Sequence, residues 1–78
     1  MELQPGDVLR DIRRYRMVLS QAGLSRRLKV NQSTISRVES GNKRMTRNLL
    51  FKLQGCVSAE DFKELKEVFD DWCRRNRQ

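Results

Sequence analysis

The chain has 78 residues, of which 37% are hydrophobic and 35% charged, a balance that indicates one small soluble domain rather than a disordered tail. Its 17 Lys and Arg against 10 Asp and Glu give a net charge of +7, and it has no His. No apolar run approaches the roughly 18 residues of a membrane span, and MELQPGDVLRD lacks the basic start and apolar core of a secretory signal. We therefore expect a cytoplasmic protein without membrane contact.

The charge is distributed unevenly along the chain. Residues 1–54 contain 12 basic and 4 acidic side chains, whereas residues 55–78 contain 5 basic and 6 acidic ones. A region this basic favours a polyanionic partner, and nucleic acid is the first choice. The alternative is an ordinary solvated surface rich in Lys and Arg. An anionic membrane is disfavoured, because no segment combines a basic face with a strongly apolar one.

The composition argues against an enzyme. The chain has no His, and its two cysteines, Cys56 and Cys73, are too far apart for a Cys-x-x-Cys site and too few for a closed zinc site. In a reducing cytoplasm we expect both to be small buried hydrophobic residues. No glycine-rich loop suited to phosphate binding is present. We therefore expect neither a metal nor a cofactor.

The hydrophobic pattern predicts helices and no strands, because β-branched residues nowhere alternate with polar ones over a useful length. Asp7 is placed to cap a first helix. The residues near one face of this helix are Val8, Leu9, Ile12 and Tyr15. Ser20 is placed to cap a second helix, after which VNQ interrupts the pattern. The inward residues of the second helix are Ala22, Leu24, Ser25 and Leu28.

Three further helices follow. The third is predicted from about Gln32 to Ser40, and Gly41 is placed to end it in a left-handed conformation. Thr46 is placed to cap a fourth helix, RNLLFKLQ, which ends near Gly55.

The fifth predicted helix, about residues 59–75, is the longest. Ser58 with Asp61 resembles an N-terminal capping pattern. The apolar stripe of this helix comprises Phe62, Leu65, Val68, Phe69 and Trp72. The sequence thus predicts one all-α domain over residues 1–78, a compact five-helix fold with a core at about residues 8–58 and an extended C-terminal helix.

The second and third predicted helices have the spacing of a helix-turn-helix, a short helix, a break and another short helix. The residues that can pack them together are Ala22, Leu24, Leu28, Val30, Ile35 and Val38. Short polar side chains on a helix in the major groove reach base edges. We expect base reading by the face opposite Ile35 and Val38, formed by Gln32, Ser33, Ser36 and Arg37. The alternatives are a plain surface role, a capping role for Ser33 and an intrahelical salt bridge for Arg37.

Basic and amide side chains flank this unit. Gln21, at the start of the second helix, is either surface or an amide that binds a phosphate. Lys43, Arg44 and Arg47 follow Gly41 and form either a solvated loop or a contact with the DNA backbone, which we expect.

The segment 19–41 resembles the helix-turn-helix of the Xre family, the phage-repressor and Cro type. The matching residues read LSQAxLS, in which x is Gly23 where the family often has Glu, and VNQSTISRVESG, of which STISRVESG is the most specific part. The resemblance is clear over residues 8–58. It implies a five-helix repressor-like fold, homodimers and pseudo-palindromic operators. It also implies base-reading positions at Gln32, Ser33 and Arg37, and phosphate contacts at Gln21, Thr34 and Ser40.

The same resemblance implies that Glu39 pairs with an Arg of the first helix, Arg14 or, after a one-residue shift, Arg13. The chain departs from the family pattern at two junctions. Val18 replaces a Gly common before the second helix, and Lys29 stands at the turn position where Gly is usual. We therefore expect Lys29 to adopt a left-handed or altered turn conformation.

These patterns predict a sequence-specific regulator of transcription, a repressor that binds a double-stranded operator as a dimer. The C-terminal helix is expected to form the dimer through Phe69 and Trp72, since Trp is favoured at interfaces. The alternative is an antitoxin that binds DNA and also a protein partner through this helix. RNA binding is disfavoured, because most of the aromatic residues are expected at buried positions and no stacking platform is evident.

Overall fold

The computed structural model describes residues 3–76, which form five α-helices and one π-helical segment. No strand occurs among these residues. The predicted all-α class is confirmed. The elements are α1 (Pro5–Asp11), η1 (Ile12–Met17), α2 (Gln21–Leu28), α3 (Gln32–Ser40), α4 (Arg47–Gln54) and α5 (Ala59–Arg75).

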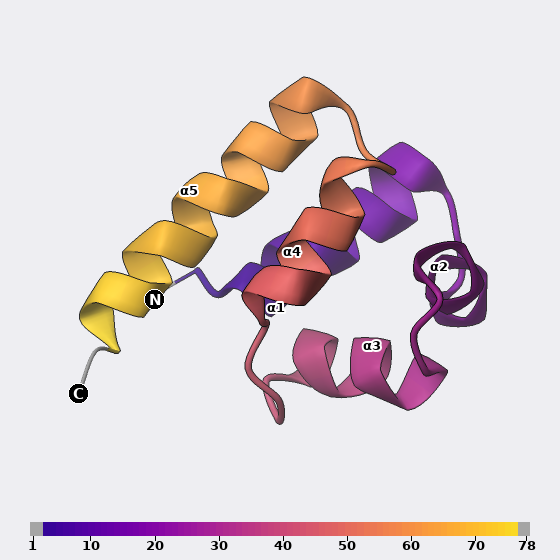
Figure 1. Ribbon diagram of the computed structural model, residues 1–78, viewed down its shortest axis with the longest axis horizontal. Coiled ribbons are helices and arrows are strands. Elements are labelled where there is room, and N and C mark those ends of the chain that lie inside the picture. Colours follow the sequence, from indigo (N-terminus) through magenta and orange to yellow (C-terminus); the bar gives the residue numbers. More distant parts are fainter. Residues whose placement is uncertain (1–2, 77–78) are drawn as a thin grey trace.

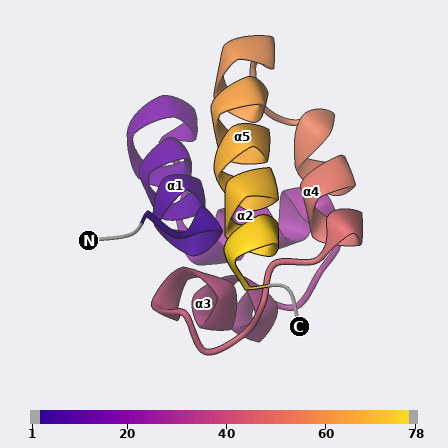
Figure 2. The ribbon, with the colours of Figure 1, turned by 90° about the vertical axis from the view of Figure 1, so that its left-hand side faces the viewer.

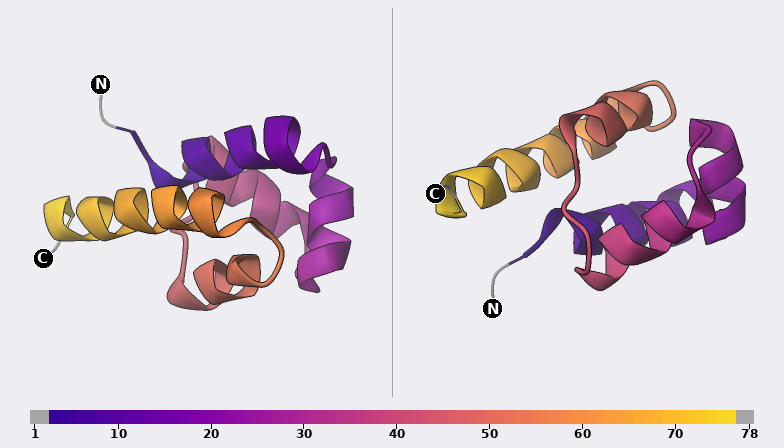
Figure 3. Two further views of the ribbon diagram at one scale, coloured as in Figure 1. Left: turned by 90° about the horizontal axis from the view of Figure 1, so that it is seen from above. Right: turned by 60° about the horizontal axis from the view of Figure 1, so that its bottom comes forward.

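The long helix α5 lies between α1 and α4, and α3 crosses beneath one end of these three helices (Figure 2). Helix α1 packs on both α3 and α5, and α2 packs on α3 and α4. The last turns of α5 extend past the neighbouring helices (Figure 3). Figure 1 shows the loop between α3 and α4 turning below these helices before the chain enters α4.

One hydrophobic core joins all five α-helices. Burial of each large aliphatic side chain contributes about 1.5–3 kcal/mol to the stability of the fold. Leu65 and Phe69 of α5 belong to this core, so α5 completes the core instead of extending from one that ends near residue 58. The most completely buried side chains are Leu9, Leu24, Ile35, Leu50, Leu53 and Leu65.

Helix α1 approaches the backbone of α3 at Gly6. A Cβ atom at this position would collide with the carbonyl oxygen of Val38, so only glycine permits the close approach. The helix also begins earlier than predicted, with Pro5 at its first position. Asp7 is therefore not the N-cap. It lies one turn inside, where its carboxylate accepts a hydrogen bond from the Gln4 backbone N–H at 3.4 Å.

The first helix widens into a π-helical turn, η1, at its C-terminal end. Hydrogen bonds between residues five apart rotate the following side chains out of α-helical register. The expected position of Tyr15 was therefore wrong, because its side chain is 72% exposed and Met17 packs against the core instead. Val18 ends the turn with φ of 54°, a left-handed conformation that β-branched residues rarely adopt.

The predicted caps of the later helices are confirmed. The side-chain oxygens of Ser20, Thr46 and Ser58 each accept a backbone N–H bond, at 3.0, 3.2 and 3.1 Å. Each satisfies one of the N–H groups left open at a helix start. Gly41 ends α3 in the left-handed region, as expected.

Candidate nucleic-acid interface

Helices α2 and α3 form one packed unit. Leu24 of α2 and Ile35 of α3 are completely buried. Lys29 leaves α2 with φ of 59°, which confirms the expected left-handed turn, and the Val30 N–H donates to the Ser25 carbonyl oxygen at 3.0 Å. This fixed turn sets the direction in which α3 leaves α2.

The outer face of α3 carries short polar side chains and one Arg. Gln32, Ser33, Ser36 and Arg37 are all exposed, whereas Ile35 and Val38 are buried beneath them. The structure brings together on one helix face the four side chains that the sequence singled out. Because the apolar residues are turned inward, this face presents only groups that donate or accept hydrogen bonds.

The single acid of α3 points inward and forms a buried ion pair. Arg13 Nε and Nη2 donate to the two carboxylate oxygens of Glu39 at 2.6 and 2.9 Å, and both residues are 5% exposed. Arg13 Nη1 also donates to the Leu19 carbonyl oxygen at 2.8 Å. Gln21 Nε2 donates to Glu39 Oε1 at 3.0 Å. This network joins the start of η1 and the connection that follows η1 to the start of α2 and the end of α3.

The partner of Glu39 is Arg13, and the assignment to Arg14 was wrong. Arg13 follows the buried Leu9 by one helical turn and so lies on the same face, whereas Arg14 points to solvent. The hydrogen bond to Glu39 raises the pKa of the Arg13 guanidinium above its ordinary value. The Arg13 guanidinium therefore remains charged, and the inward position of Glu39 removes a repulsive carboxylate from the outer face of α3.

The side chains expected to contact phosphate lie in three different environments. Gln21 is half-buried with its amide held by Glu39, which fixes its direction at the start of α2. Ser40 is exposed, and its hydroxyl donates to the Arg37 carbonyl oxygen at 3.1 Å. Thr34 is half-buried at the side of α3 that faces α4. Ser40 thus belongs to the last turn of the outer face of α3, Gln21 lies beside Glu39, and Thr34 is less accessible.

The loop between α3 and α4 holds the basic side chains. It begins in a tight turn, in which the Asn42 and Lys43 backbone N–H groups donate to the Arg37 carbonyl oxygen at 2.9 and 3.1 Å. Lys43, Arg44 and Arg47 are exposed. Sequence reasoning missed where two of them point, because the guanidinium groups of Arg44 and Arg47 pack against aromatic rings of α5, which only the tertiary fold brings near.

The residues expected at a dimer interface differ in exposure. Phe69 is 2% exposed and packs in the core of a single chain, so it cannot contact a second copy directly. Trp72 is half-buried. The expectation that most aromatic residues are buried was wrong: of the five, Phe69 alone is buried, Tyr15 and Phe51 are exposed, and the other two are half-buried. The two cysteines are free and half-buried.

No family model, curated protein or solved structure matches this chain. Within residues 3–76, no helix has the length and apolar character needed to cross a membrane. The same residues contain no group of three or more His, Cys, Asp or Glu side chains that could hold a metal ion. A functional assignment therefore depends on the geometry of the site itself.

Proposed function

We propose that this protein is a sequence-specific double-stranded DNA-binding regulator of transcription. In this proposal α2 and α3 form a helix-turn-helix, and α3 enters the major groove. The observation that carries it is the outer face of α3, which combines exposed Gln, Ser and Arg side chains with an inward-turned Glu39. A helix that carries its only acid in a buried ion pair is suited to a polyanion.

The side chains of α3 match the chemistry of base edges. An amide such as that of Gln32 pairs with adenine through two hydrogen bonds, and a guanidinium such as that of Arg37 pairs with guanine in the same way. Ser33 and Ser36 are short enough to let the helix approach the groove floor and can bond to several bases. These four residues are the proposed base readers.

Contacts with the phosphates of the DNA backbone would fix the position of α3 in the major groove. Gln21 lies at the start of α2 against Glu39, Ser40 follows Ser36 by one turn on the outer face of α3, and Lys43 follows in the loop. Each is placed to meet a phosphate when α3 lies in the groove, and such contacts position a protein without reading sequence. Thr34, Arg44 and Arg47 complete the proposed set, the two arginines through the free edges of their guanidinium groups.

We further propose that the protein binds DNA as a homodimer and represses transcription by occupying the operator. One short recognition helix reads few base pairs, and a two-fold dimer would place two such helices about 34 Å apart, one turn of duplex. Trp72 is the remaining candidate for an interface between copies. Sedimentation of Trp72→Ala at tens of micromolar tests this role, because loss of self-association is expected, and an unchanged dimer would place the interface elsewhere.

Selection of bound duplexes from a random pool tests the proposal as a whole. We expect enrichment of a pseudo-palindrome whose half-sites are separated by about one helical turn. A pool that stays random after repeated selection would contradict sequence-specific binding. A DNA-binding regulator of this kind would act in the cytoplasm, where bacterial and phage operators lie.

A further inference from the structure

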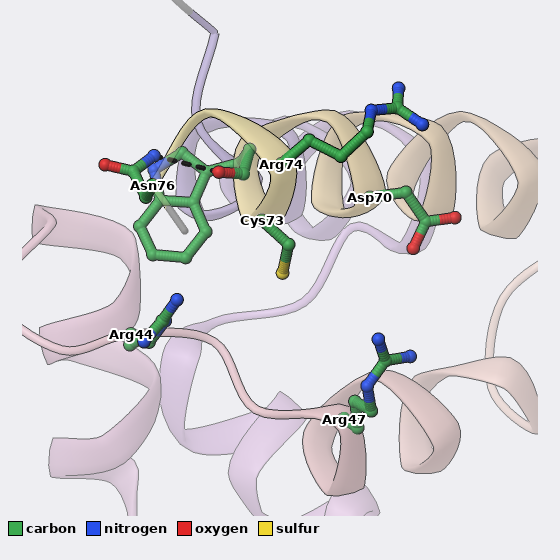
Figure 4. A pocket seen from close by; sticks show the side chains of 7 residues that line it. Arg44, Arg47, Asp70, Cys73, Arg74 and Asn76 are labelled. Carbon is green, nitrogen blue, oxygen red and sulfur yellow. Dashed lines mark hydrogen bonds between the residues drawn. The ribbon is translucent and has the colours of Figure 1, made fainter. Parts of the chain in front are cut away.

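A hollow of about 830 Å³ separates the C-terminal end of α5 from the loop that leads into α4. Asp70, Trp72 and Cys73 line it from α5, and Arg44 and Arg47 line it from the opposite side. Figure 4 shows the guanidinium groups of both arginines directed across the hollow toward α5, and the thiol of Cys73 directed into it. The hollow is thus a charged space, and it does not overlap the outer face of α3.

Both arginines lie over aromatic rings of α5. The Cζ atom of Arg44 lies 4.9 Å from the centroid of the Trp72 ring, and that of Arg47 lies 5.7 Å from the centroid of the Phe69 ring. A cation–π contact of this kind is an attraction to the ring and gives the N–H groups no oxygen acceptor, so they can still donate hydrogen bonds to an oxyanion. No ion pair within residues 3–76 engages either arginine. Neither guanidinium is therefore engaged by a salt bridge, and each is held beside an aromatic ring.

Asp70 is the acid that lines the hollow, and its charge acts on Arg47 without forming a salt bridge with it. Lys66 Nζ donates to Asp70 Oδ2 at 2.9 Å, and this hydrogen bond lowers the pKa of the Asp70 carboxyl. The charges of Arg47 and Arg74 lower the same pKa further, so Asp70 stays ionised, with Lys66 as its hydrogen-bond partner. Arg74 also lies at the hollow, but its guanidinium contacts Asp71 at 3.6 Å and points away from Arg44 and Arg47 (Figure 4).

We infer that this hollow binds a small phosphate-bearing compound between Arg44 and Arg47. Two guanidinium edges give the multiple charge-assisted hydrogen bonds that a tetrahedral oxyanion accepts. The inference goes beyond the proposed function and, where it concerns regulation, rests on it. A bound phosphate would occupy the donors that the two arginines otherwise offer to the DNA backbone, so the compound and DNA would compete.

The single Trp of the chain lines the hollow, so its fluorescence reports directly on occupancy. The probe is pyrophosphate, titrated without DNA at an ionic strength held constant with KCl. We expect a saturable change in Trp72 fluorescence. Arg47→Gln should weaken binding about tenfold, as expected for removal of a hydrogen-bonded charge, and Arg47→Lys should weaken it less. Arg26→Gln, which removes an exposed charge on α2, should bind like the unchanged protein.

Two results would overturn the inference: no saturable response to pyrophosphate, or an equal midpoint for Arg47→Gln and Arg26→Gln. Circular dichroism confirms that each variant folds. Pyrophosphate should also weaken duplex binding in the unchanged protein and much less in Arg47→Gln. Because the first titration contains no DNA, it stands or fails independently of the proposed function.

Discussion

Helices α3 and α5 bury their apolar residues in the same core, but they present opposite chemistry to solvent. The exposed side chains of α3 include no acid, and no ion pair within residues 3–76 engages Arg37. The outer face of α5 mixes acids and bases that neutralise one another, as in the ion pair of 2.9 Å between Lys66 and Asp70. Burial of apolar residues therefore explains why both helices form. Their outer faces differ in charge pairing: the acids and bases of α5 pair with one another, whereas the hydrogen-bond donors of α3 remain available to a partner.

The acidic side chains of α3 and α5 also differ in where they lie. Glu39 of α3 is buried against Arg13, while Glu60, Glu64 and Glu67 of α5 are exposed. A carboxylate on the outer face of α3 would repel a polyanion, and the same group on α5 favours solubility at little cost. The same residue type thus lies on opposite faces of the two helices, and only α3 keeps its outer face free of negative charge.

The largest expected effect comes from removing the inward acid. Glu39→Ala leaves the Arg13 guanidinium buried without its partner, so we expect the free energy of unfolding to fall by about 3–5 kcal/mol. Glu64→Ala on the exposed face of α5 is the matched control and should change it by less than about 0.5 kcal/mol. Chemical unfolding followed by circular dichroism measures both. Equal effects of the two substitutions would show that the ion pair does not hold α3 against η1.

The next effect concerns binding. Gln32→Ala and Arg37→Ala should each weaken binding to the selected duplex by about 1–3 kcal/mol and relax base preference at one position. Both residues are exposed, so stability should change little. Lys63→Ala on α5 is the control and should leave binding to the selected duplex unchanged.

The readout is fluorescence anisotropy with the selected duplex and with a shuffled one. Equal weakening on both duplexes would show that Gln32 and Arg37 only grip the backbone. If Lys63→Ala weakens binding as much as Arg37→Ala does, the distinction between the two helices disappears.

A smaller effect is expected in the salt dependence. Arg44→Ala and Arg47→Ala should each remove one phosphate interaction and so reduce the slope of log K against log salt by about 0.9 in magnitude. Arg14→Ala, an exposed Arg on η1 away from the loop, should leave the slope unchanged. If Arg44→Ala and Arg47→Ala leave both the affinity for DNA and the slope unchanged, then these two arginines line the hollow beside α5 and do not contact DNA.

Local signals explain what the sequence predicted correctly. Ser20, Thr46 and Ser58 cap helices because a short hydroxyl before a helix satisfies an open N–H, and this depends on few neighbours. Lys29 and Gly41 adopt the left-handed backbone conformation that ends a helix, each at the point where one helix stops before the next begins. The exposed face of α3 followed from helical periodicity alone.

Tertiary packing explains what the sequence could not predict. Because of the π-helical turn, Met17 packs against the core in the place expected for Tyr15. No residue pattern in the sequence predicts that wider turn. Arg13 was within reach of sequence reasoning, since it follows the core residue Leu9 by one turn. The close approach at Gly6 and the stacking of Arg44 on the Trp72 ring depend on elements far apart in the chain.

Amide chemical-shift mapping on addition of the selected duplex compares α3 and α5 in a single experiment. We expect the largest shifts at residues 32–37 and in the loop at residues 42–44, with little change along the outer face of α5 at Glu60, Glu64 and Glu67. Shifts concentrated on that acidic face, or none on α3 at saturating duplex, would contradict the proposal that α3 is the DNA-reading helix.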